Sequence, residues 1–132
     1  MASRSFPFIP ASAARLRLGD LLAIPYDDGS WAVLQVSSLR TGLGSGSSFG
    51  VGVLPWRGPS PPTAADIEEI EFIEHGLTRI EIFREGGAVV VDTAPLARGP
   101  QSNLTDMNVG TVHKVWGWRT AMDRARSAGS GD

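Results

Sequence analysis

Hydrophobic and polar positions follow the clearest pattern in the first third of the chain. Residues 21–24 form an apolar run, and residues 31–36 place mainly apolar side chains on both faces of an extended segment. A segment that is apolar on both faces is typical of a strand inside a sheet. Asp28-Gly29 lies between the two runs, and Asp-Gly readily takes the positive φ angles of a tight hairpin. The pattern therefore predicts a β-hairpin whose second strand lies in the interior of a sheet.

A third strand is expected over residues 49–53. Its large apolar side chains lie on one face, and Gly50 and Gly52 lie on the other. Glycines in a strand allow a bulky ring or another backbone to approach closely. The four prolines of residues 55–62 lack N–H donors, so that stretch is predicted to be irregular.

The segment 64–75 fits two patterns. Thr63 and Asp66 have the spacing of a capping box, and Gly76 offers a C-cap. Three isoleucines recur at helical spacing: Ile67, Ile70 and Ile73. These features favour a helix over residues 64–75. Apolar and acidic residues also alternate over residues 69–73, which is typical of a strand, and the strand remains the alternative.

The rest of the chain predicts further strands and a short helix. Alternation over residues 79–83, followed by Glu85-Gly86-Gly87 and an apolar run at 88–92, predicts a second hairpin. A long loop at 93–107 and a last strand at about 109–118 follow. Residues 121–128 favour a short helix.

These elements, together with 16 glycines and 9 prolines, predict a β-rich α+β fold. We expect roughly six antiparallel strands in a curled sheet or partly open barrel, with one packed helix. The expected organisation is a flexible segment at 1–14, a single domain at 15–126 and a disordered tail at 127–132.

Composition removes several classes of function. The chain has no cysteine, which excludes disulfides, thiolate metal sites and cysteine nucleophiles. No apolar run is long enough to span a bilayer, and we expect a cytoplasmic protein with no membrane partner. The net charge of −2 argues against a broad surface for phosphate backbones, so nucleic acid is an unlikely partner.

Catalytic candidates are few. His75 and His113 are the only histidines, and as an acid–base pair, with Lys114 or Arg119 holding a phosphate, they would make a metal-independent ribonuclease. The sequence favours structural roles instead, because His75 falls at the end of the predicted helix and His113 alternates with strand residues. We therefore expect no enzymatic activity, no metal and no cofactor.

An acidic segment offers the main candidate for partner binding. Its carboxylates are Asp66, Glu68, Glu69, Glu71 and Glu74. Such a run is often a solvated surface, but concentrated negative charge also steers association with a basic protein. The alternative is a small barrel that binds nucleic acid through Trp116, Trp118, Lys114 and Arg119, with bases stacked on the rings.

The stretch Gly19-Asp20-Leu21-Leu22-Ala23-Ile24-Pro25, followed by Asp28-Gly29 and Trp31-Ala32-Val33-Leu34-Gln35-Val36, resembles the opening of the immunity protein 26 family of bacterial polymorphic toxin systems. The resemblance covers residues 19–36. It implies a protein that binds and neutralises a cognate toxin, such as a basic nuclease, by occlusion and without catalysis. The family carries no motif that assigns the acidic segment to the toxin, so that assignment is our own inference.

Overall fold

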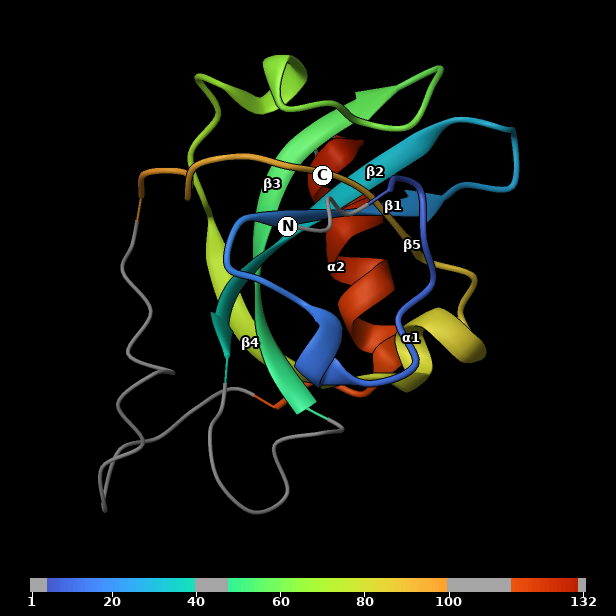
Figure 1. Cartoon of the computed structure of the whole chain (residues 1–132). Coiled ribbons are helices and arrows are strands. Elements are labelled where there is room, and N and C mark those ends of the chain that lie inside the picture. Colours follow the sequence, from blue (N-terminus) through green and yellow to red (C-terminus); the bar gives the residue numbers. More distant parts are fainter. Residues whose placement is uncertain (1–4, 40–47, 100–114, 131–132) are drawn as a thin grey trace.

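The computed structural model describes residues 5–39, 48–99 and 115–130, and its β-strands form one antiparallel sheet (Figure 1). The strands are β1 (Asp20–Pro25), β2 (Trp31–Leu39), β3 (Ser48–Gly58), β4 (Glu74–Arg79) and β5 (Val89–Thr93). The helices are η1 (Ala13–Arg15), η2 (Ala65–Ile67), α1 (Glu81–Arg84) and α2 (Trp118–Gly129). The strand order is β4-β3-β2-β1-β5. The β-rich α+β class with one main helix is confirmed, with five strands among the described residues instead of the expected six.

The predicted hairpin is present and lies at the centre of the sheet. Strands β1 and β2 pair in antiparallel register from Leu21 opposite Gln35 to Pro25 opposite Trp31. Gly29 takes a φ of +88° in the turn, a conformation that favours glycine. Strand β2 lies between β1 and β3, and its middle residues are buried on both faces, as the apolar pattern predicted.

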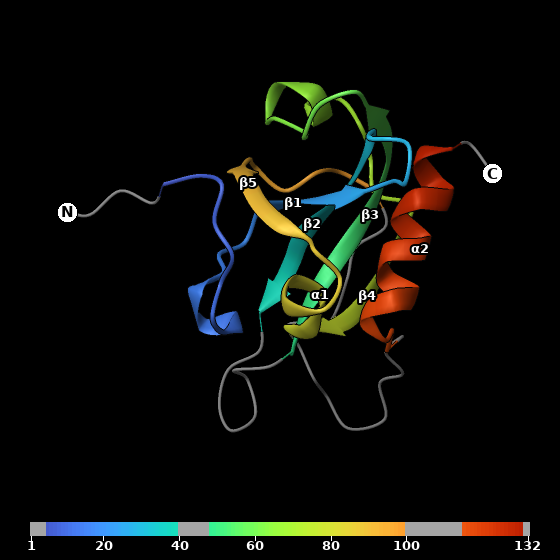
Figure 2. The ribbon, with the colours of Figure 1, turned by 90° about the vertical axis from the view of Figure 1, so that its right-hand side faces the viewer.

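Each face of the sheet supports its own hydrophobic cluster. On one face the strands pack against α2, which buries Ala121, Met122 and Ala125 (Figure 2). The cluster on the other face joins the strand residues Leu21, Val33 and Leu54 to Ile67 and Phe72 of the segment between β3 and β4. That second face therefore holds the acidic segment in place.

Helix α2 confirms the short helix expected at 121–128 and extends it in both directions. The Tyr26 hydroxyl donates to the carbonyl oxygen of Arg126 at 2.6 Å, and Arg126 Nε donates to the carbonyl oxygen of Pro25 at 2.9 Å. These bonds fasten the last turn of α2 to the hairpin. At the other end of the chain Phe8 pairs with Val90 of β5. Packed structure thus extends beyond 15–126 on both sides.

The first turn of α2 has no side-chain cap, because its N-cap residue is Gly117. A serine hydroxyl at this position can accept a hydrogen bond from the first turn, and a Cβ atom added there meets nothing within 4 Å. We expect Gly117→Ser to raise the free energy of unfolding by about 0.5 kcal/mol, as measured by urea denaturation. Gly117→Ala, which lacks the hydroxyl, is the matched control. Equal stability of the two variants would contradict the capping argument.

The helix predicted over residues 64–75 is wrong. Only the single turn of η2 is helical, and the chain continues without regular structure until β4 begins at Glu74. The isoleucines at helical spacing do not share a buried face, since Ile67 is 2% exposed and Ile73 is 50% exposed. Pairing of β4 with β3 and burial of Phe72 outweigh the local helical preference.

The second hairpin is also wrong, because its two predicted strands do not pair. Strand β5 is present, but residues 81–84 form the one-turn helix α1, which buries Ile82 and Phe83. Strands β4 and β5 lie at opposite edges of the sheet. The chain between them therefore crosses from one edge to the other instead of turning back beside β4.

Two other boundaries differ from expectation. Strand β3 continues through Pro55 to Gly58 because its register with β2 shifts between Val53 and Arg57, and the exposed Pro55 lies in that irregular stretch. Of the strand expected at 109–118, residues 109–114 lie outside the described part of the chain. Val115 pairs in parallel with Leu77, and Trp118 already begins α2.

Candidate protein-binding surface

The five carboxylates of the acidic segment have different roles in the structure. Asp66 Oδ2 accepts a hydrogen bond from the Thr63 N–H at 3.0 Å, and the Asp66 N–H donates to Thr63 Oγ1 at 3.4 Å. The capping box that the sequence predicted is thus formed, but it closes only the single turn of η2. Asp66 therefore stabilises the local fold.

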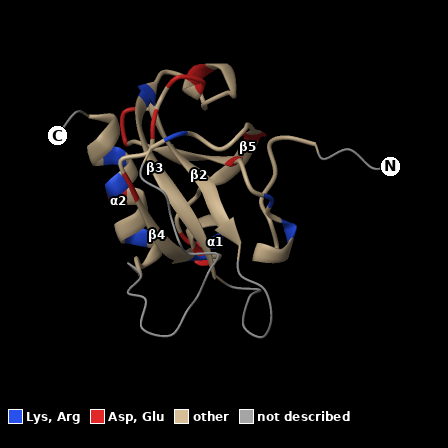
Figure 3. Ribbon diagram, turned by 90° about the vertical axis from the view of Figure 1, so that its left-hand side faces the viewer, with Lys and Arg blue, Asp and Glu red and all other residues tan. Residues whose placement is uncertain are grey.

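Glu74 also has an internal role. It lies in β4, and its carboxylate pairs with the Arg124 guanidinium of α2 at 3.8 Å, with the Glu74 side chain only 19% exposed. Figure 3 shows basic residues along α2 and acidic residues over η2 and the segment that follows it. Glu74 joins these oppositely charged regions, so it is not an available contact for a partner.

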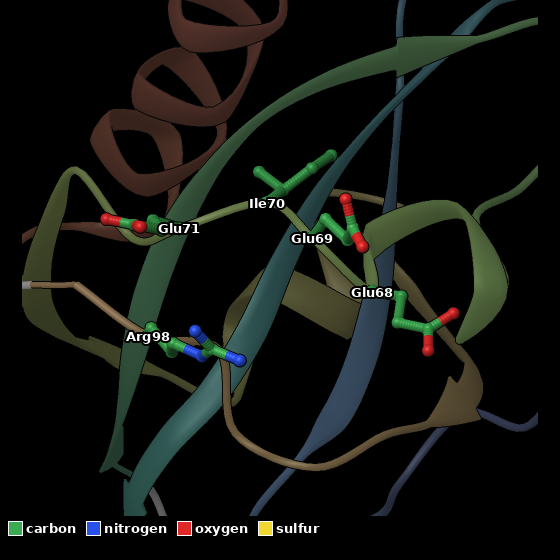
Figure 4. A pocket seen from close by; sticks show the side chains of 5 residues that line it. All are labelled: Glu68, Glu69, Ile70, Glu71 and Arg98. Carbon is green, nitrogen blue, oxygen red and sulfur yellow. The ribbon is translucent and has the colours of Figure 1, made fainter.

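Glu68, Glu69 and Glu71 remain, and all three are exposed. They line a cavity of about 300 Å³ together with Ile70 and Arg98. Figure 4 shows Glu68 and Glu69 on one side of it, Glu71 pointing away from them, and Arg98 on a separate segment. The ion pairs within 4.0 Å that join described residues involve none of these three glutamates. Their charge is therefore open to solvent and to a partner.

The backbone that carries the three glutamates is anchored at both ends. Ile67 and Phe72 are buried in the second hydrophobic cluster. The Phe72 N–H donates to the carbonyl oxygen of Arg98 at 2.7 Å, and the Phe72 ring lies 4.6 Å from the His75 ring between centroids. Glycine at position 52 is required because a Cβ there would overlap the Phe72 ring. The Phe72 ring thus makes the close approach to β3 that the strand glycines predicted. The exposed carboxylates thus stand on fixed backbone.

Gln35, which was not among the predicted site residues, holds the segment opposite the glutamates. Its side chain is fully buried. The two N–H groups of Nε2 are shared among the carbonyl oxygens of Gly19 at 3.1 Å, Ala94 at 3.2 Å and Pro95 at 3.1 Å, and Oε1 accepts from the Ala97 N–H at 3.0 Å. A polar side chain within an apolar strand was the only available signal, and it did not reveal these partners. Arg98, which follows this segment, was likewise missed.

Of the two histidines, only His75 lies in the part of the chain that the structure describes. His75 lies in β4 and not at a helix C-terminus, which corrects the expected position. Its Nδ1 lies 3.3 Å from Ser37 Oγ. His113 lies outside the described residues, so the ribonuclease alternative stays a prediction. Within the part of the chain that the structure describes, no group of three or more His, Cys, Asp or Glu side chains is placed to hold a metal ion.

Trp116 and Trp118 do not lie on one strand, although both fall within the strand expected at 109–118. Trp116 is 6% exposed, and its ring packs so closely on Gly76 that a Cβ there would lie 2.5 Å from it. A base cannot stack on a ring that is buried in this way. Trp118 begins α2 and has the Arg119 guanidinium 5.0 Å from its ring centre. Lys114 lies outside the described residues. The nucleic-acid alternative therefore loses one of its two predicted stacking rings, since Trp118 is only partly buried.

Two carboxylates with lowered pKa values lie away from the acidic segment. Hydrogen bonds from Ser30 lower the pKa of Asp28 in the β1–β2 turn, and the Arg57 guanidinium adds to this effect. A backbone hydrogen bond at Glu81 itself lowers the pKa of that residue, with a further contribution from Arg79. Asp28 lies in the β1–β2 turn and Glu81 at the start of α1, so neither contributes to the candidate surface.

Comparison with models of known protein families, with curated proteins and with solved structures gave no match. No helix among the described residues combines the length and apolar character needed to cross a bilayer.

Proposed function

We propose that this chain is a non-catalytic binding module that recognises a basic protein through Glu68, Glu69 and Glu71. The observation that carries the proposal is the exposure of these three carboxylates, without ion pairs to described residues, on an anchored segment. Concentrated charge of one sign raises the association rate with an oppositely charged protein and selects against like-charged ones.

More specifically, we infer an immunity protein that neutralises a cognate toxin, such as a basic nuclease, by covering its surface. The resemblance to the immunity protein 26 family supports this reading. The residues that carry the resemblance form the β1–β2 hairpin, and most of them are buried. They would therefore supply the scaffold, and the acidic segment would supply the contacts with the toxin.

The test is capture of the partner from a lysate of the source organism with nuclease added, using the tagged chain. The three-glutamine variant carries Glu68→Gln, Glu69→Gln and Glu71→Gln. We expect one stoichiometric basic protein on the wild-type chain, weaker retention in high salt, and about tenfold weaker affinity for the variant. This estimate assigns about 0.5 kcal/mol to each of three exposed charge contacts.

The matched control removes the same number of negative charges elsewhere, with Asp27→Asn, Glu85→Gln and Asp123→Asn, and should keep the affinity. Equal binding by the three-glutamine variant would refute the acidic surface as the contact. Material that disappears on nuclease treatment would indicate nucleic acid as the partner. Cleavage of RNA by the purified chain, abolished by His113→Ala, would overturn the non-catalytic assignment.

A further inference from the structure

A second, larger cavity lies beside the acidic segment and forms a groove of about 540 Å³. Its walls are mainly small and apolar: Ala64, Ala65, Ile67, Ala94, Pro95 and Leu96. Glu68 and Arg98 line both this groove and the cavity beneath the three glutamates, so the two spaces adjoin. An apolar groove therefore continues into a negatively charged one.

Both walls of the groove are fixed by hydrogen bonds from the sheet. Asp92 Oδ2 of β5 accepts from the Ala64 N–H at 2.8 Å and holds one wall. Gln35 holds the other through Ala94, Pro95 and Ala97. A site formed before binding costs little conformational entropy when it is occupied, which increases affinity for a given contact area.

We propose that this groove seats a short extended segment of the basic partner, with an apolar side chain in the groove and a neighbouring Lys or Arg beside Glu68. The inference rests on the proposed function and specifies what the acidic surface recognises. The adjoining cavity is lined by three carboxylates and by the one guanidinium of Arg98. Its lining therefore carries a net charge of −2, which complements a basic residue of the partner. Leu96, which is 46% exposed, is a large apolar side chain available at the rim.

The groove can be tested without the natural partner. A phage-displayed library of random short peptides is selected on the immobilised full chain, and the enriched peptides are synthesised and measured by fluorescence anisotropy. We expect enriched sequences that place an apolar residue next to Lys or Arg. Ala65→Phe, which fills the groove from an exposed position, should weaken their binding about tenfold, and Glu68→Gln about threefold.

Ala14→Phe adds the same ring at an exposed position of η1 and should leave peptide binding unchanged. Leu96→Arg is the second groove variant, and its added positive charge should weaken binding by repelling the basic residue of the peptide. It replaces Ala65→Phe in the test if that variant does not fold. Failure to enrich any peptide, enrichment without basic residues, or equal binding by both groove variants would overturn the inference.

The two proposals fail in different ways. If the captured basic protein is lost by the three-glutamine variant but bound normally by Ala65→Phe and Leu96→Arg, the acidic surface stands and the groove is not used. If the three-glutamine variant still binds that protein, the proposed function is itself wrong, and the groove loses its premise.

Discussion

Gln35→Leu should lower the free energy of unfolding by about 3 kcal/mol. The fully buried Gln35 amide has two N–H donors, shared among three carbonyl oxygens, and one accepting oxygen, which together amount to three hydrogen bonds of about 1 kcal/mol each. Leucine is similar in volume but leaves the carbonyl oxygens of Ala94 and Pro95 and the Ala97 N–H without this partner. Urea denaturation followed by tryptophan fluorescence gives the free energy, and the loosened groove wall should also weaken peptide binding.

Ser38→Ala provides a control on the same strand with the opposite expectation. Ser38 is fully buried like Gln35, but its hydroxyl has no hydrogen-bond partner among the described residues. Removing an unsatisfied buried hydroxyl should leave stability unchanged or raise it. A loss of similar size in Ser38→Ala and Gln35→Leu would mean that strand β2 is sensitive to any substitution, and the specific role of Gln35 would be rejected.

Gly52→Ala should destabilise the protein by about 2 kcal/mol and weaken partner binding at the same time. The new methyl group would overlap the Phe72 ring, and forced displacement of a buried ring usually costs about 1 to 3 kcal/mol. Phe72 also donates from its backbone to Arg98, so its displacement would shift the segment that carries Glu71. Thermal unfolding and anisotropy with an enriched peptide measure the two effects.

A double-mutant cycle separates this clash from other effects of alanine in a strand. Phe72→Leu removes the ring and should itself destabilise the protein by leaving a gap. Combined with Gly52→Ala, it should cost less than the sum of the two single changes, because the added methyl group then partly fills the space. Strict additivity would show that the ring contact is not the source of the effect.

Local signals in the sequence predicted part of the fold correctly. Asp28-Gly29 between two apolar runs identified the central hairpin, and the glycines of β3 indicated a closely packed ring. The segments at 64–75 and 80–84 could not be assigned in this way. Their structure depends on pairing with β3 and on burial against the sheet, and neither contact can be read from short-range periodicity.

The candidate surface could be predicted only in outline. The acidic composition of residues 66–74 and the pairing of Asp66 with Thr63 could be recognised in the sequence. The pairing of Glu74 with Arg124 could not, because Arg124 lies far along the chain from Glu74. The groove was not predictable, because Gln35 fixes a wall that lies about sixty residues away in sequence. Long-range hydrogen bonds of a single buried amide leave no periodic pattern.

The position of α2 in the chain has a consequence for biosynthesis. The five strands of the described residues leave the ribosome before the helix that supplies Ala121, Met122 and Ala125 to the main cluster. Until α2 emerges, the apolar face of the nascent sheet lacks its cover and is a surface that chaperones recognise. Stable folding of the sheet is therefore deferred until this helix has left the ribosome, and a ribosome that stalls before α2 emerges would display an incompletely folded chain.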